Sequence, residues 1–277
     1  MHLYKTSQGI VLQRDSGFRF VDAEWDDLIA NDRLYEWLAS LDTDAGDAAG
    51  TAVAEHLLAP IGTQEIWACG VTYYNSQMAR REESSQAGGA DFYTRVYHAE
   101  RPEIFFKSTA NRAAGHRQPV RIRKDSSWDV PEPELTLVVS PSGKILGYTV
   151  GNDMSSRSIE GENPLYLPQA KTYRQSAGIG PGIWVTQTSL APDTEISLEI
   201  FRNDQVAFSG STRISAINRR FEDLVAWLYR ELDFPCGAYV MTGTGIVPPR
   251  EFTLEAGDRI EIDITGVGKL VQPVVRD

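Results

Sequence analysis

The sequence predicts a mainly β protein of the α+β class, with a sandwich-like or barrel-like core, a few helices and a small N-terminal α/β unit. From residue 65 onward, short runs rich in β-branched and aromatic residues alternate with Gly, Pro, Asn and Asp, which is typical of successive strands and turns. Only two segments of this region carry a clear helical pattern. Before residue 60, strand-like pieces are followed by helical ones, so we expect two units.

The N-terminal unit is expected to cover residues 1–60, and the large catalytic unit residues 61–277, because Pro60 and Gly62 break the pattern between them. Asp, Gly and Ala in Thr43–Thr51 predict a loop or linker inside the small unit. Its predicted strands and helix are Gly9–Gln13, Phe18–Val21 and Asn31–Leu41.

In the large unit, two helices are expected, one opened by Asn75 as a possible cap and one with an apolar stripe. Asn203 and Asp204 predict a tight turn between two strands. The predicted helices are Asn75–Ser84 and Arg219–Leu232. The predicted strands are Ile66–Val71, Ile104–Lys107, Leu135–Val139, Ile145–Val150, Ile183–Thr186, Ile196–Arg202, Gln205–Ser209, Tyr239–Thr242, Arg259–Ile264 and Leu270–Val275.

Two of these strands form a hairpin that brings carboxylates together, because Pro141 to Lys144 between them is a turn sequence. With the turn centred between Ser142 and Gly143, the facing pairs are Val139 with Leu146, Glu134 with Gly151, and Glu132 with Asp153. Cross-strand partners share a face, and so do residues two apart on one strand. The diagonal between Asp153 and Glu134 is about 7 Å.

Three clustered carboxylates repel one another unless they are protonated or bind a cation. Oxygen ligands favour a hard ion, so Glu132, Glu134 and Asp153 predict a site for Mg²⁺, with Mn²⁺ or Ca²⁺ as alternatives. The opposing interpretation is a solvated acidic hairpin end, because one bulge would break the register. Gly151 opposite Glu134 favours the metal site, since it leaves space for a ligand near the backbone.

Composition narrows the classes of partner. The chain has 277 residues, is 42% hydrophobic and carries a net charge of −11, which argues against nucleic acid and anionic membranes as partners. The two cysteines, Cys69 and Cys236, suggest no disulfide framework, so a cytoplasmic location is expected, with Cys69 as a buried thiol. Neither a membrane span nor a secretory signal is expected.

A charged stretch followed by small residues lies between Tyr73 and His98. It begins with Arg80, Arg81, Glu82 and Glu83 and continues through Ser, Gln, Ala and Gly to residue 89. This composition suits a helix end that leads into a flap over an active site. A surface loop with solvated charges is the alternative interpretation.

Five separated motifs resemble the fumarylacetoacetate hydrolase superfamily over about residues 65 to 275. They are Trp67–Tyr73, Pro131–Leu135, Gly147–Arg157, Gln169–Lys171 and Met241–Gly245. Within the superfamily the chain looks most like the 2-keto-3-deoxy-D-arabinonate dehydratase branch, on the segments Ala79–Ser84, Pro102–Lys107 and Glu160–Tyr166.

The resemblance implies a rolled mixed β-sandwich, a homodimer, and action on small 2-oxo acids or 1,3-dicarbonyl compounds. It also implies that the three carboxylates are the metal ligands, usually for Mg²⁺. A 2-oxo acid that chelates the ion would be activated for loss of a C3 proton, because the metal stabilises the enolate. A 2-keto-3-deoxypentonate that then loses its C4 hydroxyl gives 2,5-dioxopentanoate.

Residue roles follow from the same resemblance. Lys171 matches the active-site lysine of the family and is the expected base. Without the resemblance, a single lysine would be interpreted as a solvated surface charge. Glu82 or Glu83 is the expected acid, or else a helix-surface carboxylate. Thr244, Tyr73 and Arg80 are expected to bind substrate, and the Thr244 segment can instead simply form a turn. Arg157 either supports Asp153 or pairs elsewhere.

The alternative function is hydrolysis of an acylpyruvate or other 2,4-dioxo acid at a carbon–carbon bond. Hydrolytic members of the superfamily generally place a histidine after the Trp67–Tyr73 segment, and this chain has none between His56 and His98. Asn111 stands where similar dehydratases lead us to expect a histidine, which affects substrate preference. A decarboxylase, a keto-enol tautomerase and a catalytically silent metal-binding relative rank lower.

Overall fold

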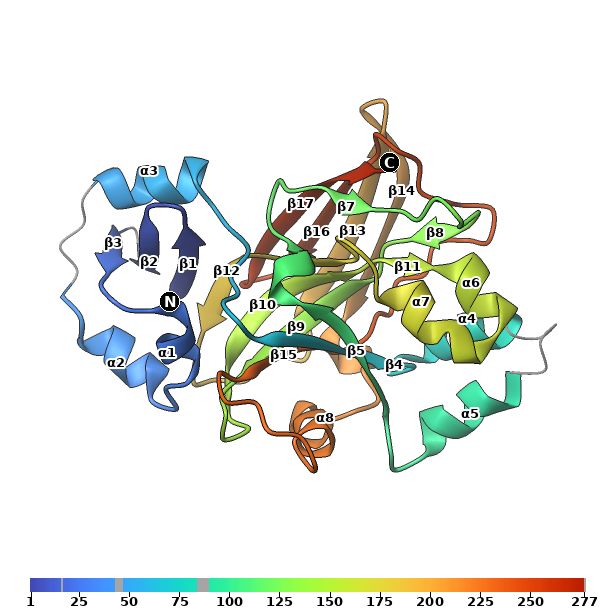
Figure 1. Cartoon of the computed structure of the whole chain (residues 1–277), viewed down its shortest axis with the longest axis horizontal. Coiled ribbons are helices and arrows are strands. Elements are labelled where there is room, and N and C mark those ends of the chain that lie inside the picture. The colour runs from blue at the N-terminus through green and yellow to red at the C-terminus, as the bar shows by residue number, and fades with distance from the viewer. Residues whose placement is uncertain (16, 43–46, 84–89, 277) are drawn as a thin grey trace.

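The computed structural model shows two β-sheets packed face to face, with helices at both ends (Figure 1). The structure describes residues 1–15, 17–42, 47–83 and 90–276, without the side chains of residues 80–83 and 90–92. The prediction of a mainly β fold with a sandwich-like core and a few helices is confirmed.

The larger sheet has ten strands and carries the predicted hairpin. Most neighbours are antiparallel, whereas β15 runs parallel to β4 and β12 runs parallel to β6. In spatial order the strands are β3 (Gly17–Val21), β2 (Gly9–Arg14), β1 (His2–Thr6), β12 (Ala177–Val185), β10 (Ile145–Asp153), β9 (Pro133–Val139), β15 (Ala238–Met241), β4 (Glu65–Gly70) and β5 (Glu103–Thr109), with β6 (Ala113–Ala114) beside β12.

The second sheet has five strands, and a two-stranded sheet lies near the helices. In the five-stranded sheet, the turn between Arg202 and Gln205 holds Asn203 and Asp204 with φ of 53° and 60°, which confirms the predicted tight turn. The five strands are β14 (Gln205–Arg213), β13 (Glu195–Arg202), β16 (Arg259–Ile264), β17 (Gly268–Val275) and β7 (Val120–Arg121), and the pair is β11 (Ser155–Ser156) with β8 (Asp129–Val130).

The side chains of β9 alternate between two hydrophobic cores, one on each face of the large sheet, and this alternation also places the carboxylates. Leu135 and Leu137 point into the core between the sheets, where they join Leu198 and Ile262. Val138 points to the opposite face and packs in a second core with residues of the N-terminal helices. Because side chains alternate along a strand, Glu134 shares the face of Val138, away from the second sheet.

Seven of the eight helices in the described part of the chain form two groups, and the last lies apart (Figure 1). The first three lie beside the N-terminal strands, the next four lie at the opposite end of the molecule beside β4 and β11, and the eighth lies below β9 and β15 in this view. The helices are α1 (Trp25–Ile29), α2 (Leu34–Ser40), α3 (Asp47–Glu55), α4 (Tyr74–Glu83), α5 (Ala90–His98), α6 (Arg157–Glu162), α7 (Leu167–Lys171) and α8 (Phe221–Leu228), with short 3₁₀ turns η1 (Ala110–Arg112), η2 (Pro164–Tyr166) and η3 (Ile214–Ala216). In the described part of the chain no helix is long and apolar enough to cross a membrane.

The N-terminal strands extend the large sheet, because β1 pairs with β12 through His2 with Trp184 and Leu3 with Ile183. Trp25 and Leu28 of α1 pack in one core with Ile179 of β12. The division at residue 60 stays a prediction.

Two local predictions were wrong. Asp47–Glu55 is helical although a loop was expected over Thr43–Thr51, whose first four residues lie outside the described ones. The Ala-rich composition of this segment favours the helix. Asn75 lies inside α4 rather than at its cap, because the helix begins at Tyr74 and the Gln77 amide already donates to the Tyr73 carbonyl. The Asn75 side-chain amide donates to the Gly245 carbonyl at 3.2 Å.

Candidate metal and substrate site

The hairpin register near the carboxylates is the predicted one. Glu134 pairs with Gly151, and the Asp153 amide donates to the Glu132 carbonyl at 2.9 Å. Nearer the turn the prediction was wrong, because Val139 pairs with Ile145 rather than Leu146 and a bulge shifts the register before Gly147. The bulge lies at the far end of the hairpin, so it leaves the carboxylates in register.

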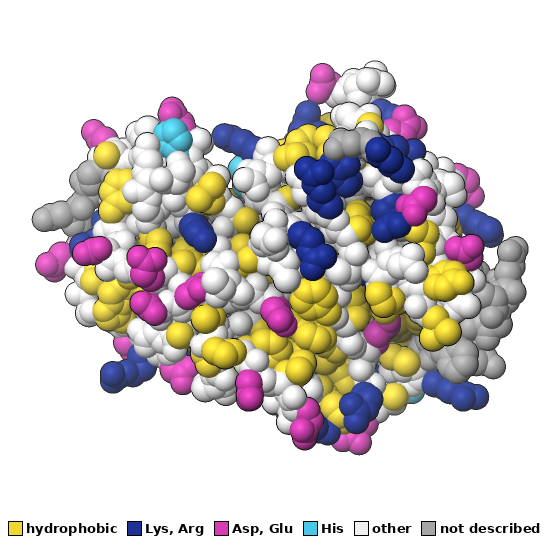
Figure 2. All heavy atoms as spheres, in the orientation of Figure 1, with side chains coloured by type: hydrophobic (Ala, Val, Ile, Leu, Met, Phe, Trp, Pro, Cys, Tyr) yellow, Lys and Arg dark blue, Asp and Glu magenta, His cyan; other side chains and the backbone are white. Residues whose placement is uncertain are grey.

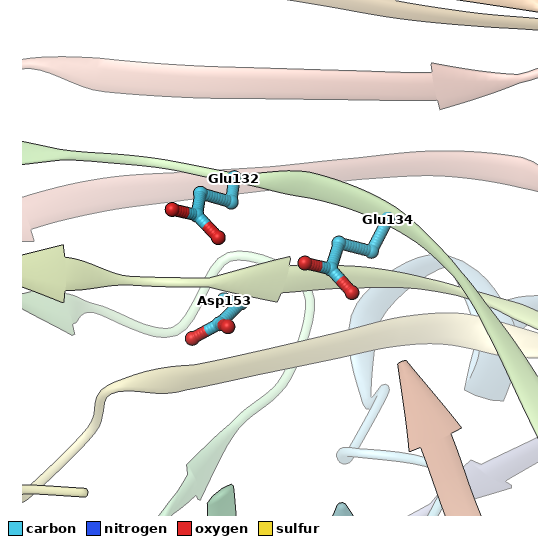
Figure 3. Close-up of side chains that lie close together, drawn as sticks. All are labelled: Glu132, Glu134 and Asp153. Atoms are coloured by element: carbon cyan, nitrogen blue, oxygen red, sulfur yellow. The ribbon is translucent and has the colours of Figure 1, made fainter. Parts of the chain in front are cut away.

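The structure brings Glu132, Glu134 and Asp153 together, and their side chains lie close to one another (Figure 3). One carboxylate oxygen from each residue lies within 4.8 Å of the others. The three residues are 4%, 1% and 1% exposed, so they do not form a solvated acidic hairpin end. Burial makes uncompensated anions costly, which is the physical reason to look for cations.

Gly151 does not provide space for a ligand, contrary to the prediction. A Cβ atom at this position would lie 2.2 Å from Thr136 Oγ1 and 3.3 Å from Met241 Cε. The glycine is therefore required by the close approach of Thr136, on the same face of the neighbouring strand.

Two buried cations contact the carboxylates from the α6–α7 side. Lys171, the last residue of α7, places Nζ 2.8 Å from Glu132 Oε2, 3.0 Å from Asp153 Oδ2 and 2.6 Å from Ser155 Oγ. Arg157, the first residue of α6, donates from Nη2 to Glu132 Oε1 at 2.8 Å. Arg157 therefore pairs with Glu132.

Sequence reasoning missed a third buried cation, Lys107 of β5. Its side chain is fully buried and Nζ lies 2.5 Å from Asp153 Oδ1. Burial lowers the pKa of Lys107, while the nearby Asp153 carboxylate opposes this shift. A lysine that ends a predicted apolar strand, Ile104–Lys107, was the available signal.

Glu134 is the least compensated of the three carboxylates. Its Oε2 accepts the Gly243 amide at 2.6 Å, but no described lysine or arginine forms an ion pair with it. Burial raises the pKa of Glu134 well above its ordinary value, and repulsion from Asp153 and Glu132 adds to the rise. A bound cation would remove this penalty.

The segment around Thr244 is used mainly by the protein itself. The Thr244 hydroxyl accepts the Ile246 amide at 3.2 Å, which fits the alternative that the segment forms a turn. Gly243 adopts φ of +91°, and its amide binds Glu134. Tyr73 is 1% exposed, and no described residue offers its hydroxyl a hydrogen-bond partner. Burial, together with the nearby Glu134 charge, raises the Tyr73 pKa.

The predicted flap residues are not placed at the site by the structure. Arg80, Glu82 and Glu83 belong to α4 by their backbone, but their side chains lie outside the described ones. His98 is exposed at the end of α5, and Asn111 accepts a hydrogen bond from Thr109 at 2.5 Å in η1.

The described donor set fits a hard divalent cation. Three buried carboxylates converge from a single hairpin, and oxygen ligands of this kind suit Mg²⁺, Mn²⁺ or Ca²⁺ better than Zn²⁺. Three ligands from the protein leave coordination positions for a chelating substrate. The surrounding three cations balance three carboxylates, so a divalent ion would leave the site positive and suited to an anionic ligand.

Comparison with known proteins agrees with this arrangement. The family model described as Fumarylacetoacetate (FAA) hydrolase C-terminal matches residues 72–275. A probable 2-keto-3-deoxyxylonate dehydratase from Haloferax volcanii is 44% identical over 247 residues, which cover 89% of this chain and 84% of the relative. A 2-dehydro-3-deoxy-D-arabinonate dehydratase from Saccharolobus solfataricus is 42% identical over 217 residues, 78% of this chain and 73% of the relative.

Solved structures give the same result for the whole fold. The apo form of 2-keto-3-deoxy-D-arabinonate dehydratase superposes with a TM-score of 0.87 at 33% identity, covering 100% of this chain and 98% of the other. A structure of 2-keto-3-deoxy-D-arabinonate dehydratase complexed with magnesium and 2,5-dioxopentanoate has a TM-score of 0.85 at 32% identity, with the same coverage. The resemblance read from the motifs is confirmed, and the chain belongs to the fumarylacetoacetate hydrolase family.

Proposed function

We propose that this chain is a Mg²⁺-dependent dehydratase that converts a 2-keto-3-deoxypentonate into 2,5-dioxopentanoate. One observation carries the proposal: three buried carboxylates and Lys171 meet at one point in a chain that aligns over most of its length with two dehydratases of such acids. The magnesium and 2,5-dioxopentanoate in the solved relative support both the metal and the product.

The three carboxylates Glu132, Glu134 and Asp153 would hold the ion. Bound there, Mg²⁺ would act as a Lewis acid on the ketone oxygen of a 2-oxo acid and so increase the acidity of its C3–H bond. The buried site excludes water, which strengthens electrostatic interactions within it.

Lys171 is the proposed base because its amine is adjacent to two of the proposed ligands. To act as the base, Lys171 first releases to solvent the proton that it shares with these carboxylates. Its neutral amine then accepts the C3 proton, the C4–O bond breaks, and the hydroxyl leaves with one proton as water. The flap carboxylates Glu82 and Glu83 are the proposed source of that proton. The elimination leaves a C3=C4 double bond conjugated to the ketone. Loss of a C5 proton with protonation at C3 turns it into a C4=C5 enol, and protonation of this enol at C4 gives the aldehyde of 2,5-dioxopentanoate.

Two further side chains are proposed to orient the substrate. The Tyr73 hydroxyl is buried without a described partner, and such groups are costly unless a ligand or water completes them. Its location near Glu134 supports a contact with a substrate oxygen. Thr244 and Arg80 complete the proposed binding set, Arg80 as a charge complement to the substrate carboxylate.

We also propose that the protein works in the cytoplasm as a homodimer with a distinct N-terminal domain. The two free cysteines suit a reducing compartment, and the dimer follows from family resemblance. Sedimentation velocity tests the assembly state.

On the face in Figure 2, Lys and Arg side chains gather over the region of β7, whereas Asp and Glu are spread over the rest.

A substrate panel read by mass spectrometry tests the proposed reaction. The panel contains 2-keto-3-deoxypentonates of each configuration and several acylpyruvates, each with Mg²⁺, Mn²⁺ or excess EDTA. The proposal predicts loss of one water from a pentonate, dependent on the divalent ion. Pyruvate plus a second acid from an acylpyruvate would instead assign the chain to carbon–carbon bond hydrolysis, and no product from any pentonate would refute the dehydratase.

A further inference from the structure

Lys107 is unusual because its charged side chain is completely buried. It lies on β5, an edge strand of the large sheet that packs against α7, the helix that ends at Lys171. Burial removes the hydration of an ammonium group, so such a lysine is retained only where other groups replace the water.

Three oxygens replace the water around Nζ of Lys107. They are Asp153 Oδ1 at 2.5 Å, the Met154 carbonyl at 2.9 Å and the Lys171 carbonyl at 2.5 Å. Two of the three N–H donors of this ammonium group go to the main-chain carbonyls, and Asp153 Oδ1 forms an ion pair with its charge. Its hydrogen bonds thus go to the main chain and its ion pair to a proposed metal ligand, which favours a positioning role over a direct chemical one.

Two of these contacts are made with residues of the proposed site, the Asp153 carboxylate and the Lys171 main chain. Lys107 binds one oxygen of Asp153 and Lys171 binds the other, at 3.0 Å, so the two lysines together fix the rotation of this carboxylate. Lys107 also holds the main-chain carbonyl of Lys171, which in addition accepts the Ser176 hydroxyl at 2.8 Å.

A neighbouring hydrogen bond reinforces the connection between the two segments. The Thr172 hydroxyl donates to the Phe106 carbonyl at 2.9 Å, which ties the residue after Lys171 to the residue before Lys107. The end of α7 is thus fastened to β5 at two adjacent points.

We propose that Lys107 is a positioning residue, which sets the orientation of Asp153 toward the cation and of Lys171 toward the substrate. This proposal rests on the proposed function only through the cation site and the role of Lys171. A purely structural lysine would change stability alone. A positioning lysine also changes metal affinity and the turnover of the metal-saturated enzyme, because groups that orient a ligand tune the metal site.

Titration of the purified protein with Mn²⁺, followed by electron paramagnetic resonance without substrate, tests the first half. Lys107→Met keeps the length of the side chain and removes its charge, and exposed Lys124→Met is the matched control. We expect Lys107→Met to bind Mn²⁺ about 10–100-fold more weakly, and the control to bind within about twofold of wild type. Unchanged affinity in a folded Lys107→Met protein overturns the proposal.

Steady-state kinetics at saturating Mn²⁺ test the second half. We expect kcat of Lys107→Met to stay at least about tenfold below wild type, with KM changed much less, because Lys171 is displaced relative to the bound substrate. Recovery of full kcat once the metal site is saturated would overturn the effect on Lys171.

Thermal unfolding shows whether each variant is folded. If Lys107→Met is not, Lys107→Gln, which keeps two N–H donors for the carbonyls, takes its place. A crystal structure of wild type with Mn²⁺ tests the proposal without any variant. Contacts of Lys107 Nζ with both Asp153 and the Lys171 carbonyl support the proposal. An Asp153 carboxylate turned away from Lys107 overturns it.

The two proposals fail in different ways. A wild-type protein that binds Mn²⁺ but dehydrates no pentonate refutes the proposed function, while the Mn²⁺ affinities of wild type and Lys107→Met still decide the role of Lys107. A wild-type protein that binds no Mn²⁺ refutes both.

Discussion

Replacing Glu134 by glutamine is expected to change stability in opposite directions with and without a divalent ion. Glu134 is buried, has two carboxylate neighbours and forms no described ion pair. The amide of glutamine has the same shape and can still accept the Gly243 N–H at Glu134 Oε2. The substitution therefore removes charge while preserving the main hydrogen bond.

The oxygen separation gives the magnitude. Two unit charges 4.8 Å apart, the upper limit of the separation between these carboxylate oxygens, repel by about 3.5 kcal/mol at an effective dielectric of 20. Attraction between Glu134 and the nearby Lys171 cancels part of this repulsion. We expect Glu134→Gln to raise the free energy of unfolding by about 1–3 kcal/mol in EDTA.

With Mg²⁺ at 100 times its Kd, wild type should gain about 2.7 kcal/mol of stability, whereas Glu134→Gln should gain little because one ligand charge is lost. Urea unfolding of both proteins in EDTA and in MgCl₂ measures these differences. Exposed Glu55→Gln is the control for the loss of a carboxylate elsewhere. Equal Mg²⁺ stabilisation of wild type and Glu134→Gln, or a variant less stable than wild type in EDTA, would refute the reasoning.

Three further predictions concern the proposed base Lys171, the buried Gly151 and the side-chain carboxylate of Asp26. Lys171→Met should lower kcat by at least about 100-fold, while calorimetry still detects Mn²⁺ binding; wild-type turnover would exclude Lys171 as the base. Gly151→Ala should lower the free energy of unfolding by about 1–3 kcal/mol, because its Cβ would lie 2.2 Å from Thr136 Oγ1, and adding Thr136→Ala should recover part of the loss in urea unfolding. Burial acts to raise the pKa of Asp26, but hydrogen bonds led by those from Thr63 hold it below its ordinary value. Asp26→Asn should therefore cost about 1 kcal/mol near pH 7, and the cost should shrink as the pH falls below about 4 and wild-type Asp26 is protonated too. A cost that grows toward low pH would contradict this sign.

The sequence was sufficient to predict the hairpin because its information is local. Turn residues between two apolar runs set the register, and the alternation of side chains then places Glu134 opposite Gly151. The bulge before Gly147 was missed, although a glycine inside a strand-like run was an available signal for it. The space assigned to Gly151 was likewise wrong, because only the packed sheet shows that Thr136 fills it.

The cations were less accessible to sequence reasoning. Lys171 and Arg157 were found through resemblance, whereas α6 and α7, which carry them, are too short for a periodic pattern. Lys107 follows an apolar run on an edge strand, where a lysine usually points to solvent. Its burial arises from the packing of α7 against β5, a contact between segments over 60 residues apart.

Anomalous scattering from a crystal soaked in Mn²⁺ tests the central claim most directly. The account predicts one strong anomalous peak among the carboxylate oxygens of Glu132, Glu134 and Asp153, and its loss in Glu134→Gln. A peak bound elsewhere on the chain, or ordered carboxylates with no peak between them, would contradict it.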